Sequence, residues 1–346
     1  MSARQVEPRI AAVHPRETTA LFGHREAELA LLNAYRSGRI PHAWLIGGPQ
    51  GIGKATLAYR MARFVLAHRD PLGSHLQRAE TLRLDPSHPV ARHVAAGAHG
   101  GLLTLERTLN DKGVLRSVIT VDETRETISF FGSTAAAEGW RVCIVDTVDE
   151  LNPNAANALL KVLEEPPQQS LFLLVSHAPA RVLPTIMSRC RKLALRPLET
   201  SEVVAAVAQA ADIAIDDPAL LEAADAAEGS VARALTLLGG DAIKLHQRTA
   251  ALLAMLPRVD PRELHALGDA LGGSDRVALG AFVDSVDRWI TERLRADEPN
   301  ANLPRLARLA EVWEKIVRAA RDTQDYNLER KPLVFSVFGM LAEATR

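Results

Sequence analysis

Cysteine is scarce in this sequence: its 346 residues include Cys143 and Cys190 and no others. Cys143 falls within an apolar strand pattern and Cys190 follows an arginine, so the pair suggests neither a disulfide framework nor a four-cysteine zinc site. Such a composition is typical of a reducing compartment. We therefore expect a cytoplasmic protein without structural disulfides and without bound zinc.

Net charge and long apolar runs are also missing. The 41 Lys and Arg residues nearly balance the 42 Asp and Glu residues, which leaves a formal charge of −1. Without a basic field over the whole protein, any contact with DNA has to come from a local patch or a partner. No apolar run approaches the length of a membrane helix, and residues 1–16 contain no signal-peptide core. We expect a non-exported protein without a membrane partner, folded as two or three domains.

A glycine-rich stretch at residues 48–54, Gly-Pro-Gln-Gly-Ile-Gly-Lys, follows a strand pattern at 42–46 and precedes a helical pattern at 55–68. This is the context of a phosphate-binding loop. The glycines let backbone N–H groups turn inward, and the helix adds its positive N-terminal end. The sequence therefore predicts a nucleotide site built from Gly48, Gly51, Gly53, Lys54, Ala55 and Thr56.

The loop departs from the G-x-x-x-x-G-K-[ST] pattern at its last position. Lys54 matches the lysine that reaches the β- and γ-phosphates, but Ala55 replaces the hydroxyl that normally holds Mg²⁺, and Thr56 comes one residue late. We expect ATP, with Mg²⁺, to be bound weakly and hydrolysis to be impaired. The alternative is a glycine-rich turn with a chance lysine.

Two further strand patterns end in polar residues. Asp146 closes the apolar run at 141–146, where P-loop proteins keep an aspartate that holds Mg²⁺ through water. Thr147 follows it, and threonine cannot act as a base for an attacking water. Ser176 closes the run at 171–176, where a polar side chain would face a γ-phosphate. The alternative for Asp146 and Ser176 is an ordinary role in a turn or cap at a strand end.

Between the loop and these strands the pattern loosens. Residues 70–101 read as an inserted loop region rich in proline and glycine. Their histidines match no zinc spacing, so we interpret them as solvated loop residues: His75, His88, His93 and His99. Short strands are predicted at 102–106 and 117–120, and a helix with Asp122 as N-cap runs to about residue 131.

Strand patterns stop near Leu198, and helical spacing follows. Cap residues predict three short helices, with caps at Ser201, Asp217 and Ser230. Long helical patterns with apolar stripes then cover 244–256, 276–295 and 306–321, separated by turns at 272–275 and 297–300. We predict an α/β domain at 1–198, a helical lid at 199–240, ending at Gly239-Gly240, and a helical domain at 241–346.

Three motifs in this order carry a family resemblance. They are residues 48–54, Asn157-Ala-Leu-Leu-Lys-Val-Leu-Glu-Glu-Pro-Pro167 and Thr185-Ile-Met-Ser-Arg-Cys190. Together they resemble the AAA+ subunits of bacterial clamp loaders, over essentially the whole chain, and Ser-Arg-Cys is the most diagnostic. The resemblance implies a RecA-like AAA+ P-loop domain with a parallel sheet, a small helical lid and a helical collar that joins subunits. Ala55 and Thr147 point to a subunit that does not hydrolyse ATP.

The resemblance also implies roles for arginines. Arg189, between Ser188 and Cys190, would act in trans as an arginine finger at a neighbouring subunit's γ-phosphate, and Arg233 would touch nucleotide from the lid. A solvated arginine is the alternative for each. The region around 69–100 carries a four-cysteine zinc module in many relatives, which this chain has lost.

The expected partners are gamma/tau and delta subunits in a hetero-pentamer, with the sliding clamp and primer–template DNA reached through the complex. The complex belongs to DNA polymerase III, a nucleotidyltransferase, while the chain's own ATPase activity is expected to be weak or absent. An independent P-loop ATPase or kinase and an ATP-dependent scaffold of DNA repair are the alternative functions. ATP turnover by the isolated chain and co-purification with clamp and polymerase subunits distinguish the three.

Overall fold

The computed structural model describes residues 13–74, 76–109, 116, 118–132, 139–238, 241–272, 276–296, 303–326 and 328–345. The chain divides into two compact units, one that reaches to Ala234 and one that starts at Leu235. The first contains a β-sheet, and the described part of the second is helical.

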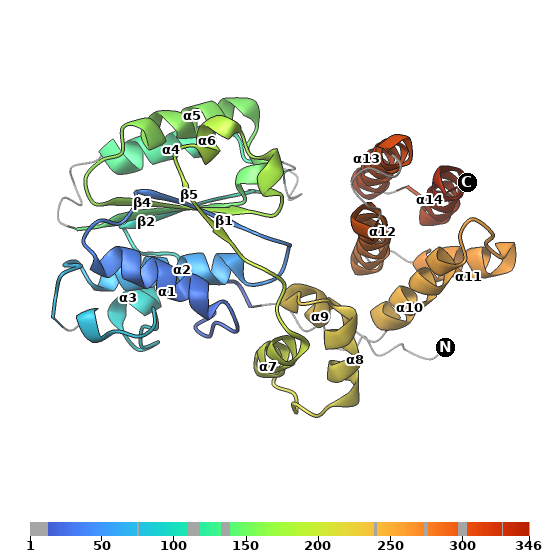
Figure 1. The fold of residues 1–346 in the computed structure, drawn as a ribbon, viewed down its shortest axis with the longest axis horizontal. Helices are drawn as coiled ribbons and strands as arrows, with labels where there is room; N and C mark the ends of the chain where they lie inside the picture. Colours follow the sequence, from blue (N-terminus) through green and yellow to red (C-terminus); the bar gives the residue numbers. More distant parts are fainter. Residues whose placement is uncertain are drawn as a thin grey trace. The chain divides into compact units, whose positions relative to one another are not determined.

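Five parallel strands form the sheet of the first unit, in the order β2-β3-β4-β1-β5 (Figure 1). They are β1 (Ala43–Gly47), β2 (Leu102–Glu106), β3 (Arg141–Asp146), β4 (Ser170–Ser176) and β5 (Arg191–Ala194). The central strands β1, β3 and β4 are buried almost throughout, because a parallel sheet is covered on both faces. The predicted α/β class with a parallel sheet is confirmed.

In the part of the first unit that the structure describes, these helices accompany the sheet: α1 (Arg25–Arg36), α2 (Lys54–Ala67), α3 (Pro89–Ala95), α4 (Val121–Gly132), α5 (Pro153–Glu164) and α6 (Pro184–Met187). Helices α1 to α3 cover one face and α4 to α6 the other (Figure 1). Side chains alternate along each strand, so Trp44 and Ile46 of β1 join the core under α2, whereas Leu45 joins the core under α5. Two separate cores therefore fix the strand ends between two helical layers.

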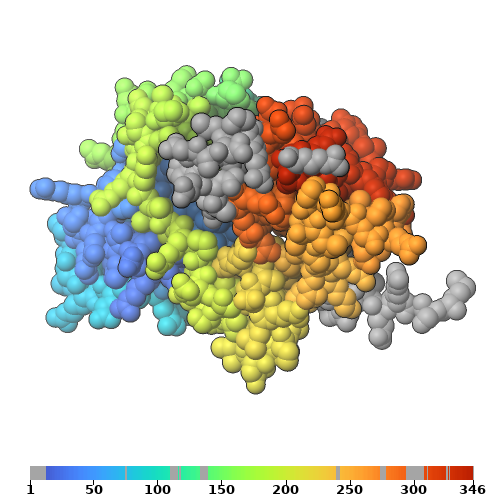
Figure 2. Space-filling view, turned by 45° about the vertical axis from the view of Figure 1, so that its right-hand side comes forward, coloured from blue at the N-terminus to red at the C-terminus, as the bar shows by residue number. Residues whose placement is uncertain are grey.

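Three short helices follow β5: α7 (Thr200–Ala211), α8 (Pro218–Ala226) and α9 (Val231–Leu237). We call α7, α8 and the first turn of α9 the lid. The lid belongs to the same unit as the sheet, and in Figure 2 the yellow-green surface of β5 and α7 continues into the yellow surface of α8. A hydrogen bond from the Leu198 N–H to the Gly229 carbonyl, 3.2 Å, ties the entry of the lid to the start of its last helix.

The second unit contains α10 (Asp241–Ala254), α11 (Pro261–Leu271), α12 (Arg276–Ala296), α13 (Leu303–Asp325) and α14 (Arg330–Ala344). The apolar stripes predicted on 276–295 and 306–321 bury Phe282, Val286 and Ile316 in one shared core. The helical character predicted for this region is confirmed. The predicted boundary at Gly239-Gly240 and the turns at residues 273–275 and 297–300 lie outside the described residues.

Several local predictions are wrong. The stretch at 117–120, as far as it is described, forms a single β-bridge, Ile119 to Leu151, in place of a strand. Helix α4 starts at Val121, because the Glu123 carboxylate accepts the Thr120 N–H at 2.6 Å, so Asp122 is not its N-cap. The region 70–101, as far as it is described, includes α3 and the short turn Leu76–Arg78.

The caps of the lid were predicted in part. Asp217 and Ser230 accept backbone N–H groups at the starts of α8 and α9, as expected. Helix α7 instead begins at Thr200, where Glu199 and Glu202 form a capping box. The prediction of Ser201 as the cap of this helix is therefore wrong.

A candidate nucleotide site and an exposed arginine

The carboxyl ends of the central strands meet at one edge of the sheet. Gly47 at the end of β1 pairs in register with Ser176 at the end of β4, and Glu106 pairs with Asp146 across β2 and β3. The Gly48 N–H donates to the Ser176 carbonyl at 3.2 Å, so the glycine-rich loop starts in direct contact with β4. In open α/β sheets this edge is where ligands bind.

The loop itself has the backbone of a phosphate-binding turn. Gly48, Gly51 and Gly53 have φ angles of 154°, 77° and 98°, a region that L side chains rarely adopt, and α2 begins directly afterwards at Lys54. The Lys54 ammonium donates to the Gly48 carbonyl at 2.7 Å and also to the Pro49 carbonyl. The lysine predicted to reach phosphates is thus engaged by carbonyls of its own loop.

Burial controls the charge of this lysine. Lys54 is 3% exposed, and burial lowers its pKa to about 8, although Asp146 and Asp149 both oppose the shift. Because both carboxylates act on the pKa of Lys54, the ammonium lies near the end of β3, which carries Asp146, and near the turn after it, which carries Asp149. The site therefore contains a buried cation within electrostatic reach of two acidic groups.

Asp146 and Thr147 stand beside the loop. Burial raises the pKa of Asp146, the neighbouring Glu106 raises it further, and Lys54 opposes both effects. Thr147 is 3% exposed, and its hydroxyl has no hydrogen-bond partner among the described residues. A buried hydroxyl without a base beside it is unsuited to activating water.

Asp149 accepts three hydrogen bonds at this edge. It lies in the short turn Val148–Glu150 after β3, and its carboxylate accepts the Ser176 hydroxyl at 2.7 Å and the backbone N–H groups of His177 and Ala178 at 2.5 and 3.3 Å. Ser176, predicted to face a γ-phosphate, therefore donates to a protein carboxylate. Sequence analysis missed Asp149; a second acidic residue three positions after the strand-end Asp146 was the available signal.

His177 is the other residue that sequence analysis missed here. Its Nδ1 atom is buried without a hydrogen-bond partner among the described residues. Burial, reinforced by the positive charge of Lys54, lowers the pKa of His177 to about 4. The imidazole is consequently neutral at pH 7 and adds no positive charge to the site.

The lid rests on the loop. The Ala232 N–H donates to the Gly51 carbonyl at 3.3 Å, and a Cβ atom at Gly51 would lie 2.2 Å from the Ser230 hydroxyl. Arg233, predicted to touch nucleotide, is half-buried in the first turn of α9, one residue beyond this contact. The backbone next to Arg233 therefore contacts the glycine-rich loop, and the predicted contact of Arg233 itself with nucleotide stays a prediction.

The residues present do not fit a Mg²⁺-ATP complex. The Lys54 ammonium is held by loop carbonyls, the Ser176 hydroxyl by Asp149, and Ala55 offers a methyl group where the pattern needs a hydroxyl. Three of the groups that would contact terminal phosphate or metal are therefore engaged elsewhere or replaced. The glycine-rich backbone and the start of α2 are the parts of the site that keep the phosphate-binding form.

Arg189 lies apart from this cluster, between α6 and β5. Its guanidinium donates to the Glu164 carboxylate at the end of α5 at 2.6 Å and to the Thr185 carbonyl at 2.8 Å. The Arg189 and Glu164 side chains are 34% and 50% exposed, and surface pairs of this kind contribute about 0–1 kcal/mol. The contact positions Arg189 at the surface and costs little to break.

The residues on either side of Arg189 have local roles. The Ser188 hydroxyl donates to the Thr185 carbonyl at 3.0 Å, which closes the last turn of α6. Cys190 is half-buried beside the core under α5, and burial raises the pKa of its thiol to about 12. A protonated thiol is a poor nucleophile, so Cys190 has a packing role.

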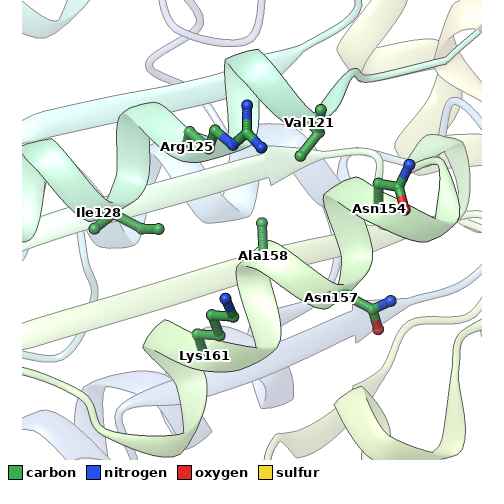
Figure 3. Close-up of a pocket in the computed structure, with 7 residues that line it drawn as sticks. All are labelled: Val121, Arg125, Ile128, Asn154, Asn157, Ala158 and Lys161. Carbon is green, nitrogen blue, oxygen red and sulfur yellow. The ribbon is translucent and has the colours of Figure 1, made fainter.

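A hollow lies between α4 and α5, on the sheet face opposite α2 (Figure 3). It is lined by Val121, Arg125, Ile128, Asn154, Asn157, Ala158 and Lys161. Figure 3 shows that each helix contributes one cationic side chain, Arg125 from α4 and Lys161 from α5. The hollow is separate from the glycine-rich loop.

Among the described residues, no group of three His, Cys, Asp or Glu side chains is arranged to hold a metal ion. His88 accepts the Val90 N–H as the cap of α3, and His99 accepts the Gly101 N–H and is half-buried, so the prediction of solvated histidines is wrong for these two. His75 lies outside the described residues. The absence of zinc stays a prediction.

No described helix is long and apolar enough to cross a membrane.

The strand order, the glycine-rich loop between β1 and α2, the strand-end Asp146 and the helical lid define a P-loop protein of the AAA+ class. Residues 23–199, just over half of the chain, match the family described as "DNA polymerase III, delta subunit". The chain belongs to this family. The family expected from the three motifs is thereby confirmed.

Relatives agree with this family. The chain is 38% identical over 149 residues to the DNA polymerase III subunit delta' of Pseudomonas aeruginosa, a match that covers 43% of this chain and 41% of that one. It is 32% identical over 215 residues to the delta' subunit of Escherichia coli, with coverage of 61% and 58%. It is also 28% identical over 282 residues to the gamma/tau subunit of Mycobacterium tuberculosis, with coverage of 79% and 46%. The matches thus span about half the length of these relatives.

Solved structures resemble the chain more remotely. A gamma subunit-related protein of DNA polymerase III from Thermotoga maritima has a TM-score of 0.42 at 15% identity, with 91% of this chain and 99% of that one covered. The Thermotoga maritima RuvB Holliday junction branch migration motor has a TM-score of 0.44 at 18% identity, with 93% and 91% covered.

Proposed function

We propose that this chain is a delta-prime-type clamp-loader subunit of DNA polymerase III that hydrolyses no ATP itself and completes the ATP site of a neighbouring subunit. Its partners are then gamma/tau and delta subunits in a hetero-pentamer, which loads the sliding clamp onto primer–template DNA in the cytoplasm. Family membership and the delta' relatives support the assignment to this complex.

A single contrast supports the proposal: the chain's own glycine-rich loop lacks groups that ATP hydrolysis needs, whereas Arg189 lies at the surface. Ala55 and Thr147 remove the metal-binding hydroxyl and the base, and Lys54 donates to its own loop. Arg189 lies in the Ser-Arg-Cys motif, and its guanidinium is held by a weak surface ion pair with Glu164 and a hydrogen bond to the Thr185 carbonyl. A subunit with these properties contributes to hydrolysis through the residue it offers to its neighbour.

The chemistry of arginine supports a role in trans. A guanidinium keeps its charge at all physiological pH values and presents a planar set of donors to phosphate oxygens. Arginine fingers contribute on the order of 10³–10⁵ in rate in other phosphoryl-transfer systems. Lysine, as a point charge, is a poor substitute.

Replacement of Arg189 by alanine tests the proposal. We expect Arg189→Ala to fold and to assemble, because its ion pair with Glu164 is exposed, but to lower DNA- and clamp-stimulated ATP hydrolysis and clamp loading by at least about tenfold. The measurement is steady-state hydrolysis and loading by the reconstituted complex at matched assembly.

Arg191→Ala is the matched control, because its exposed guanidinium lies over the Trp44 ring of the same subunit at 5.1 Å and is expected to affect loading little. If Arg189→Ala loads the clamp as well as the unmodified chain does, Arg189 is a solvated turn residue and not an arginine finger. ATP turnover by the isolated chain that is lost in Lys54→Ala would instead favour an independent ATPase.

A further inference from the structure

The end of β4 directs three donors at one carboxylate. The hydroxyl of Ser176 and the successive backbone N–H groups of His177 and Ala178 all donate to Asp149, which reaches them from the turn after β3. Ser176 is fully buried. The cluster thus brings a buried hydroxyl and two consecutive backbone N–H groups onto one carboxylate at the end of β4.

The cluster is directly attached to the glycine-rich loop. The Ser176 carbonyl accepts the Gly48 N–H, and Gly47 and Ser176 are partners in the sheet. The negative charge of Asp149 also acts on both Lys54 and His177. The carboxylate therefore lies where the loop, its lysine and the end of β4 converge.

A hydroxyl and consecutive backbone N–H groups are the donors that phosphate oxygens accept in protein anion sites. In a P-loop the lysine reaches the β- and γ-phosphates, so the terminal phosphate lies on the lysine side of the loop, toward the neighbouring strand ends. Here a carboxylate already accepts these donors. His177 supplies no compensating charge, because it is neutral at pH 7.

We propose that the Asp149 carboxylate takes the place of a terminal phosphate, so that this loop discriminates against nucleoside triphosphates and in favour of diphosphates. A γ-phosphate would have to displace Asp149 from three donors or lie beside a second anion in a partly buried site, where like charges repel strongly. A diphosphate ends farther from Asp149 and keeps the loop backbone and the start of α2. The proposal rests on the proposed function in one respect, that this site is not a hydrolytic centre.

The test compares Asp149→Asn and Asp149→Ala with the unmodified chain of 346 residues. The measurement is equilibrium titration with fluorescent methylanthraniloyl derivatives of ATP and ADP, with and without Mg²⁺. We expect removal of the charge to raise ATP affinity by at least about tenfold and ADP affinity by less than about threefold. Asparagine keeps the shape and can still accept the two backbone N–H groups, so this variant is expected to fold.

Asp122→Asn, at a carboxylate whose side chain is 83% exposed, controls for a general change in net charge and should alter neither affinity. The proposal is wrong if the Asp149 variants bind ATP no more tightly than the unmodified chain does, or if none of the chains binds ATP detectably. It is also wrong if the affinities for ATP and ADP increase equally in the variants. Tighter binding of ATP than of ADP by the unmodified chain would also overturn it, without any variant. Because the isolated chain is used, this outcome is independent of the Arg189 assay.

Discussion

At the scale of single residues, Lys54 is a buried cation whose charge the fold tolerates poorly. Its pKa falls from 10.5 to about 8, with burial as the main cause, so the unfolded chain binds a proton more tightly than the folded chain does. The charged lysine therefore lowers the free energy of unfolding below pH 8, and this penalty is relieved as the pH rises from 8 toward 10.5.

We compare the free energy of unfolding of the unmodified chain with that of Lys54→Met. We predict that the value for the unmodified chain rises by about 2 kcal/mol relative to the value for Lys54→Met when the pH is raised from 7 to 9.5. Urea unfolding followed by tryptophan fluorescence measures the difference, with Trp289→Phe and Trp313→Phe in all samples so that the signal comes from Trp44 and Trp140 of the first unit. Lys192→Met, at an exposed position of β5, controls for the loss of a lysine. Parallel pH dependences of the unmodified chain and Lys54→Met would show that Lys54 is solvated.

The sequence allowed part of the candidate site to be named. The loop glycines, Lys54 and Asp146 are recognisable because their roles depend on spacing along the chain and on a strand that comes directly before them. The contact of Asp149 with Ser176 joins residues 27 positions apart and depends on how tightly the turn after β3 folds back. No periodicity encodes that distance, so the engagement of Ser176 was visible only in three dimensions.

At the scale of secondary-structure elements, the contact between α9 and the glycine-rich loop is the feature most open to test. Gly51 and Gly53 both have positive φ angles, so alanine strains the backbone at either position by roughly 1–2 kcal/mol. At Gly51 the new Cβ would also lie 2.2 Å from the Ser230 hydroxyl and 2.9 Å from the Ala232 Cβ, whereas at Gly53 the nearest atoms are 4.0 Å away.

We therefore predict that Gly51→Ala costs about 1–3 kcal/mol more than Gly53→Ala in the free energy of unfolding. Gly51→Ala should also expose the lid, which limited trypsin digestion at Arg196 and Arg233 would detect as faster cleavage. Equal losses and equal digestion rates for the two variants would mean that α9 does not rest on the loop in solution.

The starts of helices α3 and α7 could not be predicted correctly from the sequence pattern alone. Pro89 was interpreted as part of a loop, yet it opens α3 after the His88 cap, as Pro218 opens α8 after Asp217. Proline stops a helix in its interior but favours its first turn, so its meaning depends on the residue before it. At α7 the Glu202 carboxylate accepts the Glu199 N–H at 3.0 Å, so the helix starts at Thr200 although Glu199 is not one of the usual cap residues Ser, Thr, Asp or Asn.

At the scale of the whole molecule, the two units have separate cores. The shared core of α10 to α14 consists of residues of the second unit alone, from Leu245 to Ala344. The first unit has its own two cores on either side of the sheet. Independent cores of this size favour independent folding, because each unit buries its apolar surface without the other.

We predict that a chain ending at residue 238 folds but no longer joins the complex. Its sheet, loop and lid keep their buried contacts, so the fluorescence of Trp44 and a cooperative urea transition should be retained. The collar implied by the family resemblance is removed, and co-purification with gamma/tau and delta subunits should be lost. Retained assembly by the truncated chain would place the subunit contacts in the first unit and leave the helical unit without a role in joining the complex.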